Sequence, residues 1–327
     1  MTAQRPLAIE LHPLETGNYR IATAAIQAFY DLITKCLRYR IPGALVYGPS
    51  RIGKTRAIEY LRLLMAANFP KITTYSMPAE HKPRHSEGPF FTNLLASVGF
   101  PNPDGGTTQK KRQQLIGKVR EACARNGSGV VVLFCDEAQR FTENEYEWLR
   151  DVHDALDQLQ IRLFTILVGQ QELRSVKTAF QRAQKTQIVA RLMVEELAFF
   201  GIRNAQDVAT CLIGYDESAY PAGTEWTYTR FYLPTATKSG FRLVDEAVTL
   251  WSEFSALHHK HGFADDLEIP MESFTRAVEI VLKESLVRDA KGYRPPLPLW
   301  QSAVRQCGYV QSRLAVSEIL PRYSFAA

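Results

Sequence analysis

Hydrophobic residues are spaced in two different ways along the first 200 positions of the chain. Helical spacing predicts helices over 19–40, 54–67, 90–99, 107–127 and 143–159. Shorter apolar or β-branched runs predict strands within the segments ALVY, KITTYSM, GVVVLFCDEAQ, RLFTILVGQQEL and RLMVEELAF. Strand and helix therefore alternate, which is typical of a mostly parallel sheet with helices on both faces.

The pattern changes after residue 200. Helical spacing returns at 202–215, 241–262 and 271–289, and a Gly/Pro/aromatic segment lies between them at 214–240. We expect an N-terminal extension and linker helix over 1–42, an α/β domain over 43–200, a smaller helical lid domain over 201–291 and a tail over 292–327.

Composition narrows the class of protein. The chain has 327 residues, 46% of them hydrophobic, and a formal net charge of +5, which permits a polyanionic partner without requiring one. Its five cysteines are scattered, with no pair at metal-binding spacing, and indicate reduced thiols. No apolar run is long enough to cross a membrane, so we expect a cytoplasmic protein without a membrane partner.

The segment GPSRIGKT, residues 48–55, has the spacing of a phosphate cradle between a predicted strand and a predicted helix. Gly48 and Gly53 allow the backbone N–H groups to turn toward phosphate oxygens, Lys54 reaches the terminal phosphates, and the Thr55 hydroxyl coordinates Mg²⁺. The alternative is a glycine turn followed by an exposed lysine. The residues expected to bind ATP here are Gly48, Pro49, Ser50, Arg51, Ile52, Gly53, Lys54, Thr55 and Arg56.

The segment VVVLFCDE supplies two acids at the end of a buried strand. Asp136 is expected to hold Mg²⁺ and Glu137 to position and polarise an attacking water. The alternative is an acidic pair that begins the next helix. Together with the cradle, this segment predicts an Mg²⁺-dependent ATPase.

Three further polar residues are assigned by position alone. Gln170 ends the strand TILVGQ, where it can touch the water or the γ-phosphate; an ordinary strand-to-helix turn is the alternative. Arg191 precedes the last strand, where an arginine can reach a neighbouring subunit's nucleotide, and Arg242 can contact the γ-phosphate from the helical domain. For both arginines the alternative is a solvated cation.

Taken together, these motifs resemble an AAA+ ATPase, with GPSRIGKT as Walker A, VVVLFCDE as Walker B, Gln170 as sensor 1, Arg191 as the finger and Arg242 as sensor 2. Glutamine is an unusual residue at sensor 1. A narrower pattern, CDEAQ followed by LRDVHDAL and LVGQQEL, is similar to the TnsC/TniB group of transposition regulators, whose relatives include MuB and ExeA.

The resemblance implies an ATPase that assembles on double-stranded DNA as a ring or helical filament, with six or seven copies per turn. It implies further partners: a TniQ-type target selector and a DDE transposase, with hydrolysis driving disassembly. A CRISPR effector upstream of the selector is left open. The alternatives are an ExeA-like ATPase of secretion-machine assembly, a STAND-like signalling switch and, less well matched by the acidic strand end, a kinase.

Two basic clusters are candidates for DNA contact. Lys110, Lys111 and Arg112 stand together near the start of a predicted helix, and His81, Lys82, Arg84 and His85 form a charged loop. Either is by itself more typical of a solvated face; with the resemblance we favour the 110–112 cluster as a phosphate contact. The aromatic segment 214–240 is either a partner-docking finger or a packed insertion in the lid. We expect the tail to dock a transposase or selector subunit; the alternative is a disordered or self-packed tail.

Overall fold

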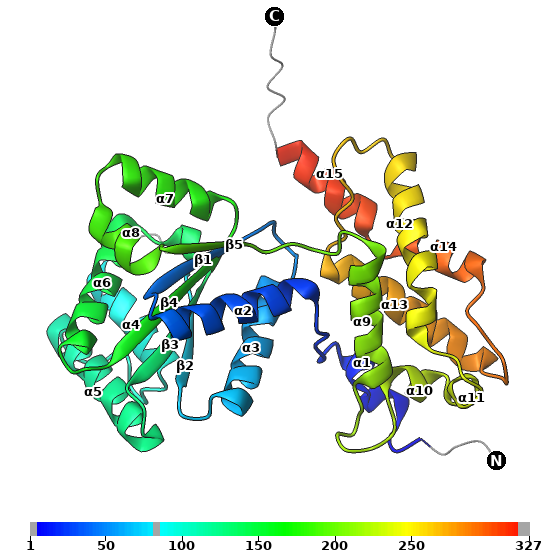
Figure 1. Ribbon diagram of the computed structural model, residues 1–327, viewed down its shortest axis with the longest axis horizontal. Coiled ribbons are helices and arrows are strands. Elements are labelled where there is room, and N and C mark those ends of the chain that lie inside the picture. Colours follow the sequence, from blue (N-terminus) through cyan, green and yellow to red (C-terminus); the bar gives the residue numbers. More distant parts are fainter. Residues whose placement is uncertain (1–4, 81–85, 320–327) are drawn as a thin grey trace, which may run out of the picture. The chain divides into compact units, whose positions relative to one another are not determined.

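The computed structural model describes residues 5–80 and 86–319, and these form two compact units. Of the described residues, the α/β unit contains 25–50, 54–80 and 86–199, and the helical unit contains 5–24, 51–53 and 200–319 (Figure 1). Each unit has its own hydrophobic core. Residues 5–24 therefore group with the C-terminal helices.

The α/β unit contains a five-stranded sheet in which every pairing is parallel. Its strands are β1 (Gly43–Tyr47), β2 (Thr73–Pro78), β3 (Val130–Asp136), β4 (Arg162–Gly169) and β5 (Glu195–Ala198). The order across the sheet is β2-β3-β4-β1-β5. The predicted parallel α/β sheet followed by a helical region is confirmed. Strands β3, β4 and β5 lie within the predicted segments, and β1 and β2 each extend one residue beyond theirs.

Helices cover both faces of this sheet (Figure 1). They are α2 (Ala24–Tyr39), α3 (Lys54–Asn68), α4 (Glu87–Ser97), α5 (Thr108–Asn126), α6 (Glu143–Asp157), α7 (Glu172–Arg182) and α8 (Thr186–Leu192). Leu45, Leu133 and Leu167 face the core shared with α4, α5, α6 and α8. Phe134 points to the opposite face, where its ring meets Phe29 of α2 edge-on. Burial on both faces explains why β3, as far as Cys135, is a continuous apolar run and β4 is interrupted only by Thr165 after its exposed first residue.

The predicted helix over 19–40 is shorter than expected, because α2 begins only at Ala24. Residues 18–23 belong to no helix or strand, and they group with the helical unit. The Tyr19 hydroxyl donates to Glu279 Oε1 at 2.5 Å, and Ile21 is buried. Tertiary contacts thus override a helical spacing that continues through these positions.

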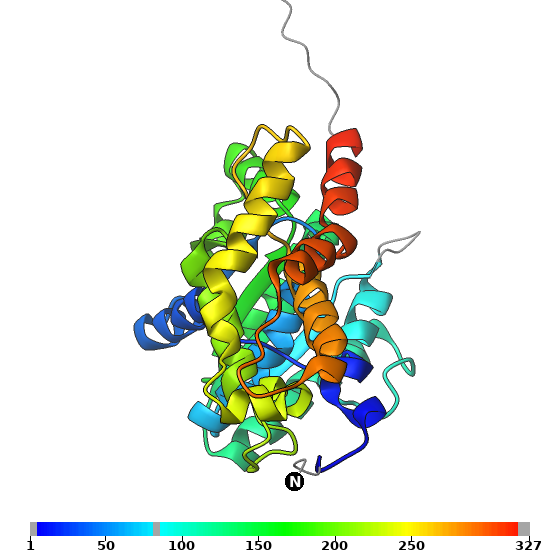
Figure 2. The ribbon, with the colours of Figure 1, turned by 90° about the vertical axis from the view of Figure 1, so that its right-hand side faces the viewer.

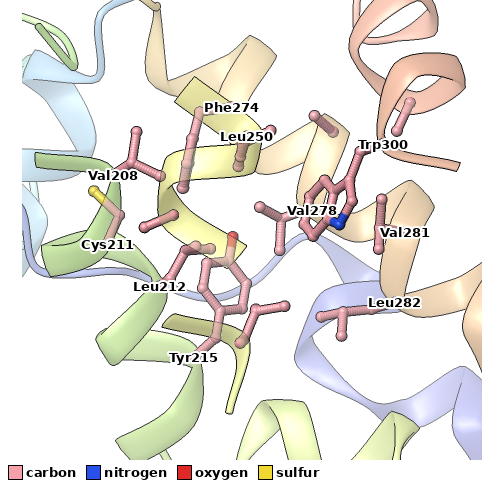
Figure 3. Close-up of a cluster of buried hydrophobic side chains, with 14 of the residues drawn as sticks. Val208, Cys211, Leu212, Tyr215, Leu250, Phe274, Val278, Val281, Leu282 and Trp300 are labelled. Atoms are coloured by element: carbon pink, nitrogen blue, oxygen red, sulfur yellow. The ribbon is translucent and has the colours of Figure 1, made fainter. Parts of the chain in front are cut away.

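The helical unit is built from α9 (Ala205–Glu217), α10 (Tyr228–Tyr232), α11 (Pro234–Lys238), α12 (Ala247–Lys260), α13 (Met271–Ser285), α14 (Leu297–Gln306) and α15 (Tyr309–Ile319), with the short helices α1 (Pro13–Thr16), η1 (Ile9–Leu11), η3 (Leu243–Glu246) and η4 (Leu286–Arg288). Figure 3 shows its core, in which Leu212 and Tyr215 of α9 meet Val278 and Leu282 of α13. The α/β unit adds one short helix, η2 (Ala138–Arg140).

The aromatic segment and the tail both belong to this core. Tyr215, Phe231 and Tyr232 are completely buried, so both ends of the aromatic segment are packed into this core. The loop between them is exposed from Ala222 to Glu225. Trp300 of α14 and Tyr309 of α15 are also completely buried, and α14 packs against α12 and α13 (Figure 2). These two aromatic residues are therefore unavailable for docking a partner. Docking by other residues of the tail stays a prediction.

Candidate functional site

The cradle lies between the end of β1 and the start of α3, as its spacing predicts. Its two glycines are required for different reasons. Gly53 has a φ of 101°, a left-handed conformation that side chains disfavour. At Gly48 the constraint is space, since a Cβ would lie 2.1 Å from the carbonyl oxygen of Phe199. Arg51 also has a positive φ, 61°, so the loop holds a non-glycine residue in a strained conformation.

Lys54 is enclosed by the cradle and is only 6% exposed. Its ammonium donates to the carbonyl oxygens of Gly48 at 2.8 Å and Pro49 at 2.5 Å. Burial lowers the pKa of Lys54, and the nearby carboxylates of Glu137 and Asp136 oppose that shift. The loop thus holds a desolvated positive charge against backbone oxygen atoms. The negatively charged oxygens of a bound phosphate would stabilise this charge further.

Thr55 and Asp136 meet although they lie 81 positions apart in the chain. The Thr55 hydroxyl donates to Asp136 Oδ2 at 2.6 Å, and the Glu137 N–H donates to Asp136 Oδ1 at 2.9 Å. Burial raises the pKa of Asp136, and these two hydrogen bonds act in the opposite direction. A hydroxyl and a buried carboxylate side by side are oxygen ligands that Mg²⁺ favours alongside phosphate, so the residues fit the expected metal.

Glu137 follows Asp136 in a left-handed conformation with a φ of 55°. This turn directs its carboxylate toward the end of β4. Oε2 accepts from Gln139 Nε2 at 2.8 Å and from Gln170 Nε2 at 3.4 Å, and it lies 3.5 Å from Arg140. The structure therefore brings Lys54, Thr55, Asp136, Glu137 and Gln170 to the carboxyl edge of the sheet, where ligands of parallel α/β proteins bind.

Arg191 lies at the opposite edge. Its carbonyl oxygen is beside Gly43, where β1 begins, whereas the cradle follows the last residue of β1. Five residues of strand separate the two edges by roughly 16 Å. Its guanidinium donates to Asp154 at 2.9 Å and lines a cavity of about 170 Å³ that also contains Arg40 and Arg162. Arg191 is thus remote from the nucleotide site of its own chain.

The remaining predicted ligands have varied surroundings. The Arg56 guanidinium pairs with Glu59 at 3.0 Å on the surface of α3, and Ile52 is buried while Ser50 is exposed. Arg242 belongs to the helical unit, where it precedes η3. Its assignment as sensor 2 stays a prediction.

The basic cluster at the start of α5 is largely engaged within its own unit. Lys111 is 7% exposed and its ammonium donates to the Thr92 hydroxyl at 2.5 Å. Arg112 pairs with Glu87 at 2.6 Å and lies over the ring of Phe91. Lys110 alone of the three is exposed. The second cluster, His81, Lys82, Arg84 and His85, lies outside the described residues.

Sequence reasoning missed Gln139, which contacts both Glu137 and the backbone of Gln170. The available signal was its place within DEAQ, two positions after the acid on which the chemistry depends. The polarity of Gln139 could not reveal that contact, because its second partner is 31 positions away.

Known protein families and solved structures share features with this chain. Residues 42–176 match the family described as AAA domain. This part of the chain is an AAA-type P-loop ATPase domain. No curated protein sequence matches the chain.

Two solved structures show the same AAA+ fold. The Aeropyrum pernix ORC1 protein, in complex with DNA, is 14% identical with a TM-score of 0.50, and the alignment covers 91% of this chain and 68% of that one. The Aeropyrum pernix ORC2 protein, in ADPNP and ADP complexes, is 12% identical with a TM-score of 0.55, covering 94% and 74%. At this identity the likeness concerns the fold.

Two further properties of the described residues complete the picture. None of the helices in 5–80 and 86–319 combines the length and apolar character that a membrane crossing requires. The five cysteines are free and buried, in line with the expected reduced thiols.

Proposed function

We propose that this protein is an Mg²⁺-dependent ATPase whose nucleotide cycle controls its assembly on double-stranded DNA during transposition. The observation that carries the ATPase part is the contact between Thr55 and Asp136, with the buried Lys54 on one side and Glu137 on the other. One half of this constellation comes from the cradle and the other from the end of β3. Their meeting supports one site built by two motifs.

Each residue has a defined task in this proposal. Lys54 and the backbone of the cradle bind the phosphates of ATP, and Thr55 and Asp136 hold Mg²⁺, which neutralises phosphate charge when bound. Glu137 orients a water molecule for attack and accepts its proton. Its contacts with Gln139 and Gln170 fix the carboxylate beside the phosphate end of the cradle.

Arg191 is proposed to act on the nucleotide of a second copy. It lies at the edge of the sheet away from its own cradle, so it has no intramolecular access to the phosphates. An arginine supplied by a neighbour makes hydrolysis depend on assembly. This supports a self-assembling ATPase, a ring or helical filament, with Arg242 of the helical unit as a further candidate for phosphate contact.

The DNA and transposition parts rest on the resemblance to TnsC/TniB proteins. LRDVHDAL occupies α6, and LVGQQEL spans the end of β4 and the start of α7. The latter includes Gln170, which contacts Glu137, so the resemblance covers the site itself. The Aeropyrum pernix ORC1 protein, whose structure contains DNA, has the same fold. A TniQ-type selector and a DDE transposase are the partners that this proposal implies.

The test combines microscopy with phosphate release. Purified full-length protein is mixed with duplex DNA, with and without a non-hydrolysable ATP analogue, and examined by negative-stain electron microscopy. We expect rings or filaments only when both are present. A protein that stays monomeric in every combination would refute assembly on DNA.

Glu137→Gln separates binding from hydrolysis in the same assay. Because the amide cannot accept a proton from water, we expect phosphate release to fall by about 10²–10⁴-fold while ATP still supports assembly. The polymers formed with ATP should then persist. Lys54→Ala is the matched control, since it should lose nucleotide binding and form no polymer. If Glu137→Gln loses ATP binding as well, the role given to Glu137 is wrong.

A further inference from the structure

One peptide group, between Gly169 and Gln170, is hydrogen-bonded on both sides. Its carbonyl oxygen accepts from the N–H of Gly48, the first residue of the cradle, at 3.2 Å. Its N–H donates to Gln139 Oε1 at 3.1 Å. The other end of the Gln139 amide donates to Glu137 Oε2 at 2.8 Å. An unbroken series of three hydrogen bonds therefore joins the cradle to the Glu137 carboxylate.

We infer that Gln139 is a positioning residue that couples the phosphate cradle to Glu137. The inference rests on the proposed ATPase function and names a residue that the motifs did not assign. A primary amide suits this task because it is both donor and acceptor, as the two contacts require. Movement of the backbone at Gly48 on phosphate binding would reach Glu137 through the peptide group and the Gln139 amide.

The Gln139 contact is the strongest of those that orient Glu137. The side chain of Gln170 is 3.4 Å from Oε2 and the Arg140 guanidinium is 3.5 Å away, both beyond the distance of a strong hydrogen bond. At 2.8 Å the bond from Gln139 to a carboxylate is short and charge-assisted. Linked hydrogen bonds also polarise one another, which stiffens the series.

Gly169 provides the space that the amide occupies. A Cβ at this position would lie 2.3 Å from Gln139 Oε1 and 3.2 Å from Leu173 Cδ2. Contacts this short would displace the amide from the peptide N–H. The glycine that ends β4 and the glutamine that follows the Asp-Glu pair are thus two parts of one arrangement. A substitution at either should have the same effect on Glu137.

The experiment compares three variants of the full chain. Gln139→Met keeps the length of the side chain and removes both hydrogen bonds; Gln139→Glu keeps the acceptor for the Gln170 N–H and places a second carboxylate against Glu137. Gly169→Ala displaces the amide without altering it. ATP affinity is measured with a fluorescent analogue, hydrolysis by phosphate release, and stability by thermal unfolding.

We expect all three variants to bind the analogue within about threefold of wild type and to lose about 10–100-fold in kcat, with KM nearly unchanged, because a misplaced carboxylate slows the chemical step. Of the two variants at position 139, Gln139→Glu should have the lower kcat. The double variant Gln139→Met/Gly169→Ala should be no slower than the slower single one, since both remove the same coupling. Gln171→Met, at an exposed neighbouring glutamine, is the control and should match wild type.

The outcomes separate this inference from the proposed function. If wild type hydrolyses no ATP, the proposed function itself fails. If Gln139→Met retains the wild-type kcat while Glu137→Gln is inactive, the ATPase stands and the coupling is wrong. If Gln139→Met loses affinity or thermal stability together with kcat, Gln139 is a structural residue and the inference is overturned. Should Gly169→Ala fail to fold, the two variants at position 139 still decide.

Discussion

Two buried charges of opposite sign dominate the site at the scale of single residues. Burial lowers the pKa of Lys54 and raises that of Asp136, so in both cases desolvation favours the neutral form. Phosphate near Lys54 and Mg²⁺ near Asp136 would favour the charged forms. The free protein therefore carries an electrostatic cost that the proposed ligands offset, as is common where stability is given up for function.

This cost predicts that Asp136→Asn stabilises the free protein and inactivates it. The asparagine can accept from the Glu137 N–H and donate to the Thr55 hydroxyl without a buried charge. Thermal unfolding at pH 7 without ligand should show a higher midpoint than wild type. ATP hydrolysis with Mg²⁺ should fall by about 100-fold or more, because a metal ligand is lost.

The destabilisation of the free protein by the Asp136 charge depends on pH. Because the folded pKa of Asp136 is raised above its unfolded value, the destabilisation is complete above the folded pKa and disappears as pH falls below the unfolded one. The advantage of Asp136→Asn should therefore shrink on acidification toward that range. A variant that is less stable than wild type at pH 7 would contradict this account of the charge.

At the scale of elements, the segment of α6 that resembles the TnsC/TniB pattern contributes side chains to the hydrophobic core. Within LRDVHDAL, Leu149, Val152, His153 and Leu156 are buried. His153 Nε2 forms a hydrogen bond of 2.7 Å with the Thr165 hydroxyl of β4, which ties the helix to the middle of the sheet. Burial, aided by Arg191, lowers the pKa of His153 to about 3.

We predict an acid-sensitive α/β unit because of this histidine. The pKa of His153 in the folded protein lies below its value in the unfolded protein. Its contribution to the free energy of unfolding is therefore complete above the unfolded pKa and is lost progressively as pH falls below that value. Between pH 7 and pH 5 the unit should lose about 2 kcal/mol through His153. Hydrogen exchange of the β4 amides, corrected for intrinsic rates, measures this loss.

His153→Gln should reduce that pH dependence, since glutamine does not titrate. The exposed His259→Gln in the helical unit is the control and should keep the wild-type dependence. An unchanged pH dependence in His153→Gln would show that other groups control acid sensitivity. His12 is a separate acid-sensitive residue, because burial lowers its pKa to about 4, but it lies in the helical unit.

The helix α14 is predicted to be essential to the helical unit. Trp300 fills the core formed with α12 and α13, and it is completely buried (Figure 3). Trp300→Ala should destabilise this unit by about 3–5 kcal/mol, because the large cavity cannot close fully. Urea unfolding followed by circular dichroism measures the change.

Leu297→Ala on the same helix is the matched control for that experiment. Leu297 is 49% exposed, so its truncation should alter stability by less than about 0.5 kcal/mol. If Trp300→Ala were equally mild, α14 would be an appendage to the helical unit, and the region after residue 292 would again be a candidate docking segment.

At the scale of the whole molecule, the DNA proposal becomes specific to one cation of the 110–112 cluster. Lys110 is exposed, whereas Lys111 and Arg112 support the packing of α5 on its neighbours. Lys110→Ala should weaken binding to unrelated duplexes by a similar factor and reduce the slope of log affinity against log salt by about 1, because one phosphate contact is lost. Fluorescence anisotropy across a salt series measures both.

Arg120→Ala is the control for that measurement. Arg120 is also exposed and lies on the same helix, so its removal changes the net charge by the same amount. Equal losses of affinity in the two variants would indicate a general charge effect, and no loss in either would place the DNA contact elsewhere. Lys111→Ala and Arg112→Ala should mainly lower thermal stability.

A structural feature could be predicted from the sequence when the residues that form it are close together in the chain. The cradle, the strand before it and the helix after it were predictable because glycine spacing and apolar periodicity act within a few residues. The start of α2 was not, since Tyr19 is drawn to Glu279, 260 positions away. The engagement of Lys111 with Thr92 likewise depends on packing between two helices.

The sequence by itself therefore determined the alternation of strand and helix, the phosphate cradle and the acidic strand end, all of which are written in local patterns. Only the tertiary structure decided that Thr55 meets Asp136, that α14 closes a core and that Gln139 links Glu137 to the peptide group beside Gly48. These contacts depend on which strand ends become neighbours. The packing of the whole sheet determines which strands are neighbours, and the spacing of hydrophobic residues along the chain does not indicate it.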